Sequence, residues 1–302
     1  MSAPLFFVVG PTATGKSAVA LDLAEVVGAQ IINADAMQFY SGMDIGTAKL
    51  SMSERREIPH HLIDILDVTE EASVSDYQVL GRRIIDTLRG DDIPVVVVGG
   101  SGLYIKALLD PLNFPGTDPI IRQRLETEAL EFGAVNMHAR LLKADPAAAL
   151  AILPGNVRRV IRALEVIELT GQPFTATLPR EGESHYPEAI QIGLKVERVE
   201  LVRRIDLRVD QMLESGFVEE VESLAQSGLR EGKTSRRALG YLQILEVLDG
   251  ATSLENARAE IKSATRKYAR RQASWFRRDD RIVWVTPEKA INQALSCLTS
   301  SA

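Results

Sequence analysis

The sequence predicts an α/β fold in which helices cover both faces of a parallel β-sheet and a helical lobe is inserted into the chain. Short apolar runs, each ending at a glycine or a polar residue, alternate with stretches of helical periodicity. Continuously apolar strands are typical of parallel sheets, because helices cover both of their faces. A long stretch with helical periodicity and no such runs predicts the lobe.

Five apolar runs predict the strands of the sheet, at residues 5–9, 30–34, 93–98, 189–196 and 281–285. Residues 17–27 place apolar side chains at helical spacing before Gly28, so a glycine-rich loop joins the first strand to a helix. Ligands of open parallel sheets bind beyond the carboxyl ends of the strands. We therefore expect this loop, Asp35 and Ser101 to meet at one cleft.

The character of the chain changes after a turn-rich segment at residues 111–116. Helical periodicity follows at 120–132, 136–144 and 157–169, bounded by Asp-Pro pairs and a Thr-Gly-Gln-Pro segment. We expect a catalytic core formed by residues 1–116 and 187–302, with a helical insertion domain at 117–186. Between residue 199 and the final strand, the chain is expected to be mostly helical.

Composition narrows the class of protein. Of the 302 residues, 45% are hydrophobic and 25% are charged, which is enough for a large buried core. The net charge of -6 argues against a uniformly basic nucleic-acid binder but leaves room for local basic patches. The single cysteine, Cys297, excludes an internal disulfide framework. No run reaches the ~20 apolar residues of a membrane-spanning helix, and residues 5–9 are too short for a signal peptide, so we expect a cytoplasmic protein.

Residues 10–17 match the pattern G-x-x-x-x-G-K-[ST] at every fixed position. In such a loop, backbone N–H groups surround phosphate oxygens at a helix N-terminus, the lysine adds a positive charge, and the final hydroxyl can ligate Mg²⁺. The pattern predicts a P-loop NTPase-like sheet with a phosphate site, and Mg²⁺ on Ser17 is the expected cofactor. The loop residues are Gly10, Pro11, Thr12, Ala13, Thr14, Gly15, Lys16 and Ser17.

Asp35, at the end of the second predicted strand, is the acid best placed to act beside this loop. Nucleoside triphosphatases with this loop usually carry a Mg²⁺-binding carboxylate after another apolar strand, but the strand at 93–98 ends in glycines. Asp35 could simply cap the next turn, or it could hold a cation or accept a proton from a nucleophile. Asp64 is a weaker alternative. His60 and His61 are expected to pack or hydrogen-bond locally.

Arginines gather in two places in this acidic chain. One cluster is Arg158, Arg159 and Arg162, and the other lies at residues 265–281, where Tyr268, Trp275 and Phe276 are interleaved with the arginines. A charged helix is often only a solvated face. Arginines interleaved with aromatic rings also suit phosphate contacts and stacking on single-stranded bases. The two clusters therefore indicate an RNA partner.

Seven segments resemble, in order, blocks of the tRNA dimethylallyltransferase (tRNA isopentenyltransferase) family. They are GPTATGKS, INADAMQFYSGMDIGTAK, PHHLIDI, GGSGLY, NVRRVIRALEV with TGQP, RRALGY, and RKYARRQASWFRRD. Two departures are visible, Ala36 where serine is common and Ser101 where threonine is common. Ser101 keeps a hydroxyl and Ala36 only neighbours the key acid, so the expected activity is unchanged.

The resemblance implies that the glycine loop holds the diphosphate of dimethylallyl diphosphate. The acceptor would be N6 of the adenosine immediately 3′ of a tRNA anticodon (position 37), flipped out of its stack into the cleft. Lys16, Arg208 and Mg²⁺ would stabilise the departing pyrophosphate, and Asp35 would accept the proton from N6.

The expected partners are thus dimethylallyl diphosphate and the tRNA anticodon stem-loop, with no membrane, and the enzyme is expected to be a monomer. The resemblance and the basic helix together suggest a set of RNA contacts. These are Asp35, Ala36, Met37, Gln38, Ser101, Arg122, Gln123, Arg158, Arg159, Arg162, Arg270 and Arg271.

Two other functions are compatible with the motifs. A small-molecule or nucleoside kinase would hold ATP in the same loop and use Asp35 to deprotonate a hydroxyl. An RNA-binding regulator would carry a vestigial loop. The missing acid after residue 98 disfavours the kinase, and the intact Lys16 and Ser17 disfavour the regulator.

Overall fold

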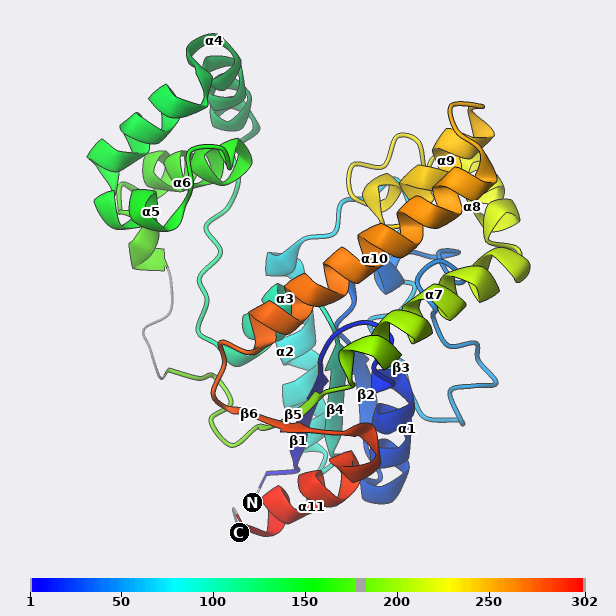
Figure 1. Cartoon of the computed structure of the whole chain (residues 1–302). Coiled ribbons are helices and arrows are strands. Elements are labelled where there is room, and N and C mark those ends of the chain that lie inside the picture. The colour runs from blue at the N-terminus through cyan, green and yellow to red at the C-terminus, as the bar shows by residue number, and fades with distance from the viewer. Residues whose placement is uncertain (1, 178–182, 301–302) are drawn as a thin grey trace. The chain divides into compact units, whose positions relative to one another are not determined.

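The computed structural model describes residues 2–177 and 183–300, and a parallel β-sheet forms part of the unit that contains both ends of the chain (Figure 1). Within these residues the sheet has six strands in the order β3-β2-β4-β1-β5-β6, each parallel to its neighbours. The strands are β1 (Leu5–Val9), β2 (Gln30–Asn33), β3 (His60–His61), β4 (Val95–Gly99), β5 (Ile190–Leu194) and β6 (Ile282–Val285).

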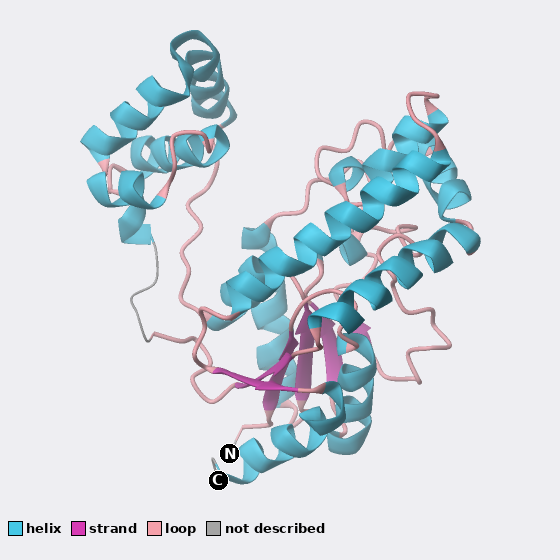
Figure 2. Ribbon diagram, viewed as in Figure 1, coloured by secondary structure: helices cyan, strands magenta, loops and turns pink. Residues whose placement is uncertain are grey.

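Side chains of β1 alternate between two apolar layers, because successive residues of a strand point to opposite faces. Leu5, Phe7 and Val9 pack with α2 (Val74–Gly90) and α3 (Gly102–Leu109) on one face. Phe6 and Val8 pack with α1 (Lys16–Val27) and α11 (Ala290–Ser300) on the other. Helices cover both faces of the sheet (Figure 2), so the predicted P-loop NTPase-like α/β fold is confirmed.

Four helices in the C-terminal part of the chain form a layer with a core of its own. They are α7 (Arg198–Glu214), α8 (Phe217–Gln226), α9 (Tyr241–Leu248) and α10 (Leu254–Phe276). α7 and α10 run side by side, as Figure 1 shows. The buried side chains Phe217, Tyr241 and Ile261 pack here with Tyr40 and Met43, which follow β2 in the chain. This packing ties the segment after β2 to the C-terminal helices.

Residues 110–185 form a compact unit separate from the unit of residues 1–109 and 186–302. The smaller unit contains α4 (Pro119–Ala144), α5 (Pro146–Ala151) and α6 (Val157–Thr170) around its own apolar core. Asp118 and Asp145 cap α4 and α5, accepting hydrogen bonds from backbone N–H groups, and a proline follows each cap. The Asp-Pro pairs read as boundaries in the sequence are therefore helix starts.

Predicted and observed elements agree within a few residues, and short 3-10 helices fill some of the connections. The helices predicted at 120–132 and 136–144 are the two halves of α4, which breaks at Gly133. The sequence pattern does not predict β3, because two residues carry no periodicity. The 3-10 helices are η1 (Ala36–Phe39), η2 (Phe174–Thr177), η3 (Ser235–Arg237) and η4 (Pro287–Lys289).

A buried ion-pair cluster joins the helices of the smaller unit. Glu165 of α6 is 0% exposed, and its carboxylate accepts hydrogen bonds from Arg122 and Arg162 and from the backbone N–H of Asp118 at 3.2 Å. Arg162 also donates to the carbonyls of Pro115 and Gly116. Burial alone would raise the pKa of Glu165, but the hydrogen bonds from the two arginines hold it below its usual value.

Replacing Glu165 by alanine leaves two partly buried guanidinium groups without their carboxylate. We expect Glu165→Ala to cost about 3 kcal/mol of unfolding free energy, as for a broken buried pair. Urea unfolding of the full chain, with hydrogen exchange of α6 to locate the loss, measures this. Glu168→Ala, which removes a more exposed partner of Arg124 and Arg140, is the control and should cost less than about 1 kcal/mol. Equal losses in the two variants would contradict the prediction.

Candidate active site

The glycine loop of residues 10–17 connects β1 to α1. Gly15 caps α1 with φ +90°, a left-handed conformation that side chains other than glycine rarely adopt. The first N–H groups of a helix have no intrahelical acceptor. In the part of the chain that the structure describes, the N–H groups of Ala13 and Gly15 donate to no protein acceptor. The loop therefore offers free N–H groups and the positive end of a helix dipole to an anion.

Lys16 lies folded back on this loop. Its ammonium group donates to the carbonyl of Pro11 at 2.7 Å. Burial lowers the pKa of Lys16 to about 8, while Asp35 opposes the shift and Arg208 adds to it. Burial disfavours the charged form of a lysine, whereas a nearby anion favours it. An anion bound by the loop would therefore stabilise the protonated Lys16.

Asp35 follows β2 and takes the capping role considered for it. One carboxylate oxygen accepts the backbone N–H of Met37 at 3.1 Å, which caps η1. Asn33 fixes the backbone of Asp35 by accepting its N–H at 2.9 Å and donating to its carbonyl at 3.0 Å. Burial raises the pKa of Asp35, against the opposing effects of the Met37 N–H, Lys16 and Arg208. The carboxylate is thus both a cap and a partly desolvated group facing two cations.

The sheet order explains how Asp35 comes to face the glycine loop. β4 lies between β1 and β2, and it ends at Gly99, followed by Gly100. A Cβ on Gly99 would lie 2.4 Å from the carbonyl oxygen of Ala34, so a side chain here would push the end of β2 away. The glycines after the strand at 93–98 therefore let an acid from β2 and a loop from β1 meet.

A cavity of about 440 Å³ lies where these groups meet. Thr12 and Ala13 of the glycine loop line it together with Asp35 and Arg208 of α7. Burial lowers the pKa of Arg208, and Asp35 opposes this shift. The remaining walls are mostly apolar and come from α7, α8, α9, the residue Leu239 before α9, and α10. Their apolar side chains are Ile205, Val209, Met212, Phe217, Leu239, Tyr241, Leu242 and Ile261.

α10 contributes a clamp that motif reading missed. Gln272 is buried, accepts the backbone N–H of Thr12 at 2.9 Å and donates to the carbonyl of Gly100 at 2.9 Å. One helical turn earlier, the side chain of Tyr268 lies beside Ser101 and Gln272. Burial, followed by the charge of Asp35, raises the pKa of Tyr268 to about 12. The spacing of Tyr268 and Gln272 on one helix face was the available signal.

Asp64, His60 and His61 are the other residues that the sequence raised near the sheet. Asp64 pairs with Lys49 at 2.5 Å and lines a second cavity of about 960 Å³, so it does not take the place of Asp35. His60 hydrogen-bonds the carbonyl of Ile58, and His61 hydrogen-bonds Gln30 of the neighbouring strand, so the expected local bonding is confirmed.

The interpretation of the aromatic residues of α10 as base-stacking groups is wrong for Phe276, which is buried in the core. Trp275 is 41% exposed but lies against Gly102, where a Cβ would approach its ring within 2.1 Å. Tyr268 lines the cavity, and the guanidinium of Arg271 lies over its ring, 5.7 Å from the centroid. Arg270 and Arg271 are exposed.

The suggested RNA contacts fall on both compact units. Residues 35–38, Ser101 and the two arginines of α10 belong to the larger unit. In the smaller unit, Arg122 and Arg162 bind Glu165, whereas Gln123, Arg158 and Arg159 are exposed. The structure thus gives Arg122 and Arg162 a structural contact that the sequence did not indicate.

Across residues 2–177 and 183–300, no helix is both long and apolar enough to cross a membrane.

The parallel sheet and the glycine loop after β1 define a P-loop-like α/β protein. Comparison with known proteins identifies the family within this class. The profile of the family described as IPP transferase matches residues 38–279. The chain belongs to this family.

Curated relatives named tRNA dimethylallyltransferase support this membership. The one from Streptomyces griseus is 56% identical over 285 residues, which cover 94% of this chain and 91% of the relative. The one from Thermobifida fusca is 58% identical over 283 residues, which cover 92% of this chain and 88% of the relative.

Two solved structures have the same fold. The full-length tRNA isopentenylpyrophosphate transferase from Bacillus halodurans superposes with a TM-score of 0.71 at 38% identity, covering 98% of this chain and 96% of that one. A eukaryotic dimethylallyltransferase acting on tRNA gives a TM-score of 0.85 at 24% identity, covering 99% of this chain and 79% of that one. The second similarity concerns the fold alone.

The lowered pKa of Lys16 predicts a pH dependence of anion binding. Below about pH 8 the lysine is protonated and attracts an anion in the glycine loop, and above that pH its charge is lost. The test is the ratio of the wild-type affinity to the Lys16→Met affinity for inorganic pyrophosphate, measured between pH 7 and 10. Taking this ratio cancels the titration of the ligand itself. The ratio should fall by up to about tenfold per pH unit above 8. A ratio that stays constant would show that Lys16 does not contact the anion.

Proposed function

We propose that this chain transfers the dimethylallyl group of dimethylallyl diphosphate to N6 of adenosine 37 in tRNA, releasing pyrophosphate. One observation carries the proposal: Asp35 and the glycine loop, with its free N–H groups, line the same cavity, whose other walls are largely apolar. A diphosphate, a short apolar chain and a proton-accepting group each find matching chemistry there. Membership of the IPP transferase family and the names of the relatives support it.

The glycine loop would hold the diphosphate of the donor. As the bond between the allylic carbon and oxygen breaks, the electron pair leaves with pyrophosphate, and negative charge grows on the leaving group. Free N–H groups of the loop, together with Lys16 and Arg208, would stabilise that charge. Because these groups are already in place, little reorganisation is needed during the reaction.

Asp35 would act on the acceptor. The N6 lone pair forms the new bond to the allylic carbon, and nitrogen becomes positively charged unless it loses a proton. The oxygen of Asp35 that does not cap η1 can accept this proton. Partial burial raises the pKa of Asp35, which makes the carboxylate a better base than an exposed aspartate.

The loop residues also fit a divalent cation. Ser17 is exposed at the start of α1, and within the described residues its hydroxyl makes no hydrogen bond to the protein. A hydroxyl beside a diphosphate matches the hard oxygen ligands that Mg²⁺ prefers. We propose Ser17 as the protein ligand of Mg²⁺, which when bound would neutralise the charge of the leaving group.

The acceptor base must leave its stack in the anticodon loop to reach the cavity. We propose that residues 35–38 and Ser101 contact the flipped nucleotide, while Arg270 and Arg271 contact phosphates of the anticodon stem-loop. The smaller unit would provide a second RNA surface through its exposed side chains Gln123, Arg158 and Arg159, whereas Arg122 and Arg162 are engaged by Glu165. We propose a monomer that works in the cytoplasm, where tRNA is available.

Isotope-labelled dimethylallyl diphosphate and unmodified tRNA test the function directly. Label that enters RNA, at a base identified by nuclease digestion as adenosine 37, is the expected result. Turnover of ATP without transfer would instead indicate a kinase, and RNA binding without either reaction would indicate a regulator. Both outcomes contradict the proposal.

Asp35→Asn separates a proton acceptor from a metal or structural residue. Asparagine keeps the size and one acceptor oxygen but cannot carry the proton away, so single-turnover transfer should slow by about 10²–10⁴-fold. Binding of dimethylallyl diphosphate, titrated on the same variant, should be nearly unchanged because the glycine loop is intact. Fast transfer combined with lost donor or Mg²⁺ binding would assign Asp35 to the metal site instead.

Affinity for tRNA should fall steeply with salt, because bound phosphates release counterions. In the double variant Arg270→Ala, Arg271→Ala, the slope of log K against log [salt] should become shallower by about 0.7–0.9 for each phosphate that an arginine no longer neutralises. Arg56→Ala, an exposed arginine already paired with Asp22 and Glu25, is the control and should keep the wild-type slope. An unchanged slope in the double variant would mean that these arginines only face solvent.

A further inference from the structure

The segment of residues 44–49, here called the partition loop, forms the wall between the two cavities. Gly46 and Thr47 line the cavity that contains Asp35. Asp44, Ile45, Ala48 and Lys49 line the second one. Ala13 of the glycine loop and Arg208 line both. The position of this loop therefore affects the shape of both cavities.

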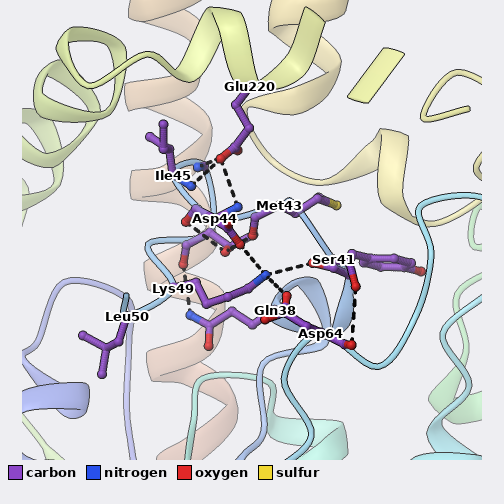
Figure 3. Close-up of polar contacts among 12 residues, drawn as sticks. Gln38, Ser41, Met43, Asp44, Ile45, Lys49, Leu50, Asp64 and Glu220 are labelled. Atoms are coloured by element: carbon purple, nitrogen blue, oxygen red, sulfur yellow. Dashed lines mark hydrogen bonds and ion pairs between the residues drawn. The ribbon is translucent and has the colours of Figure 1, made fainter. Parts of the chain in front are cut away.

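A carboxylate from a distant part of the chain holds the partition loop (Figure 3). Glu220 of α8 accepts the backbone N–H groups of Asp44 at 3.0 Å, Ile45 at 2.6 Å and Gly46 at 3.2 Å. It also accepts the hydroxyl of Tyr241 at 2.6 Å, and burial together with the charge of Glu220 raises the pKa of that tyrosine. One acid thus binds three consecutive amides and a phenol, and such charge-assisted hydrogen bonds are stronger than neutral ones.

The loop has no freedom to move toward α8 or α9. A Cβ on Gly46 would lie 2.3 Å from the ring of Phe217 and 2.6 Å from that of Tyr241. These two rings also line the cavity that contains Asp35. Glu220 therefore draws the backbone of the loop against the aromatic wall of the site, which only glycine allows at this point.

The other end of the loop is held by a buried cation. Lys49, whose side chain is 2% exposed, donates to Asp44 at 2.6 Å, to Asp64 at 2.5 Å and to the carbonyl of Tyr40 at 2.9 Å. Gln38, three residues after Asp35, donates to the carbonyl of Thr47 at 3.2 Å. The partition loop is thus linked directly to the segment that begins with Asp35.

We propose that Glu220 is a positioning residue for the transfer reaction, which acts by fixing the partition loop between the two cavities. The inference rests on the proposed function only for its predicted effect on the rate of dimethylallyl transfer. Glu220 touches neither the glycine loop nor Asp35 in these contacts, so its removal should disturb the geometry of reaction and leave the diphosphate cradle intact. Misplacement of reacting groups by about 1 Å can cost about 10²-fold in rate.

Hydrogen exchange tests the structural part without any activity. In Glu220→Ala, the amides of residues 44–46 should exchange about tenfold faster or more, as expected for the loss of a charge-assisted hydrogen bond. Exchange in the rest of α8 should stay close to that of the wild type, and the melting temperature should fall only modestly, because the buried Tyr241 hydroxyl loses its acceptor. Glu222→Ala, an exposed acid on the same helix, is the matched control and should change nothing.

Kinetics test the functional part. With labelled dimethylallyl diphosphate and tRNA, Glu220→Ala should lower the single-turnover rate by about 10- to 100-fold. The KM for the donor should remain near the wild-type value. Glu220→Gln keeps the size and one acceptor oxygen, so its rate should lie between those of the wild type and Glu220→Ala.

Three results would overturn the proposal. The first is unchanged exchange at residues 44–46 in Glu220→Ala. The second is a rate that falls only together with the melting temperature and with protection throughout α8, which would make Glu220 an ordinary structural residue. The third is a raised donor KM with an unchanged rate. If the wild type itself transfers no label, the proposed function fails, and the exchange experiment still decides whether Glu220 holds the loop.

Discussion

The burial of one acid between two cations is the constraint on which the site depends. Burial raises the pKa of Asp35 and lowers those of Lys16 and Arg208, and each charged form is stabilised by a neighbour of opposite sign. Two cations, Lys16 and Arg208, face the single acid Asp35. A bound diphosphate would add negative charge beside these cations. The site is therefore poised to accept an anion, and its charges must be held in position by contacts that are themselves neutral or fully paired.

Those contacts come from elements far away in the chain. Gln272 of α10 joins the glycine loop to the loop after β4, and Asn33 fixes the backbone of Asp35. Glu220 of α8 holds the partition loop, and Lys49 closes its other end. The side-chain amide of Gln272, which accepts one hydrogen bond and donates another, fixes two loops without adding charge near the glycine loop. The C-terminal helices thus complete a site whose proposed reactive groups come mostly from the first 35 residues.

The smaller unit shows how the same residue type serves two purposes. Arg122 and Arg162 are drawn to the buried Glu165, and Arg162 also binds two loop carbonyls, so these side chains join α4, α6 and the segment before α4. Arg158 and Arg159 lie on the same helix as Arg162 but are exposed. A buried carboxylate needs paired donors, whereas exposed guanidinium groups remain able to bind phosphate.

The sequence by itself determined the glycine loop, the buried strands, the helical stretch between them and the acid after β2, because these features rest on local rules. Periodicity and the special conformations of glycine and proline act over a few residues, so β1, α1 and the Asp-Pro helix starts could be read directly. Only the tertiary structure decided that β4 lies between β1 and β2, and that Gln272 and Glu220 reach the loops they hold. These contacts join residues more than 170 positions apart, and no local pattern encodes which backbone amide a distant carboxylate or amide side chain meets.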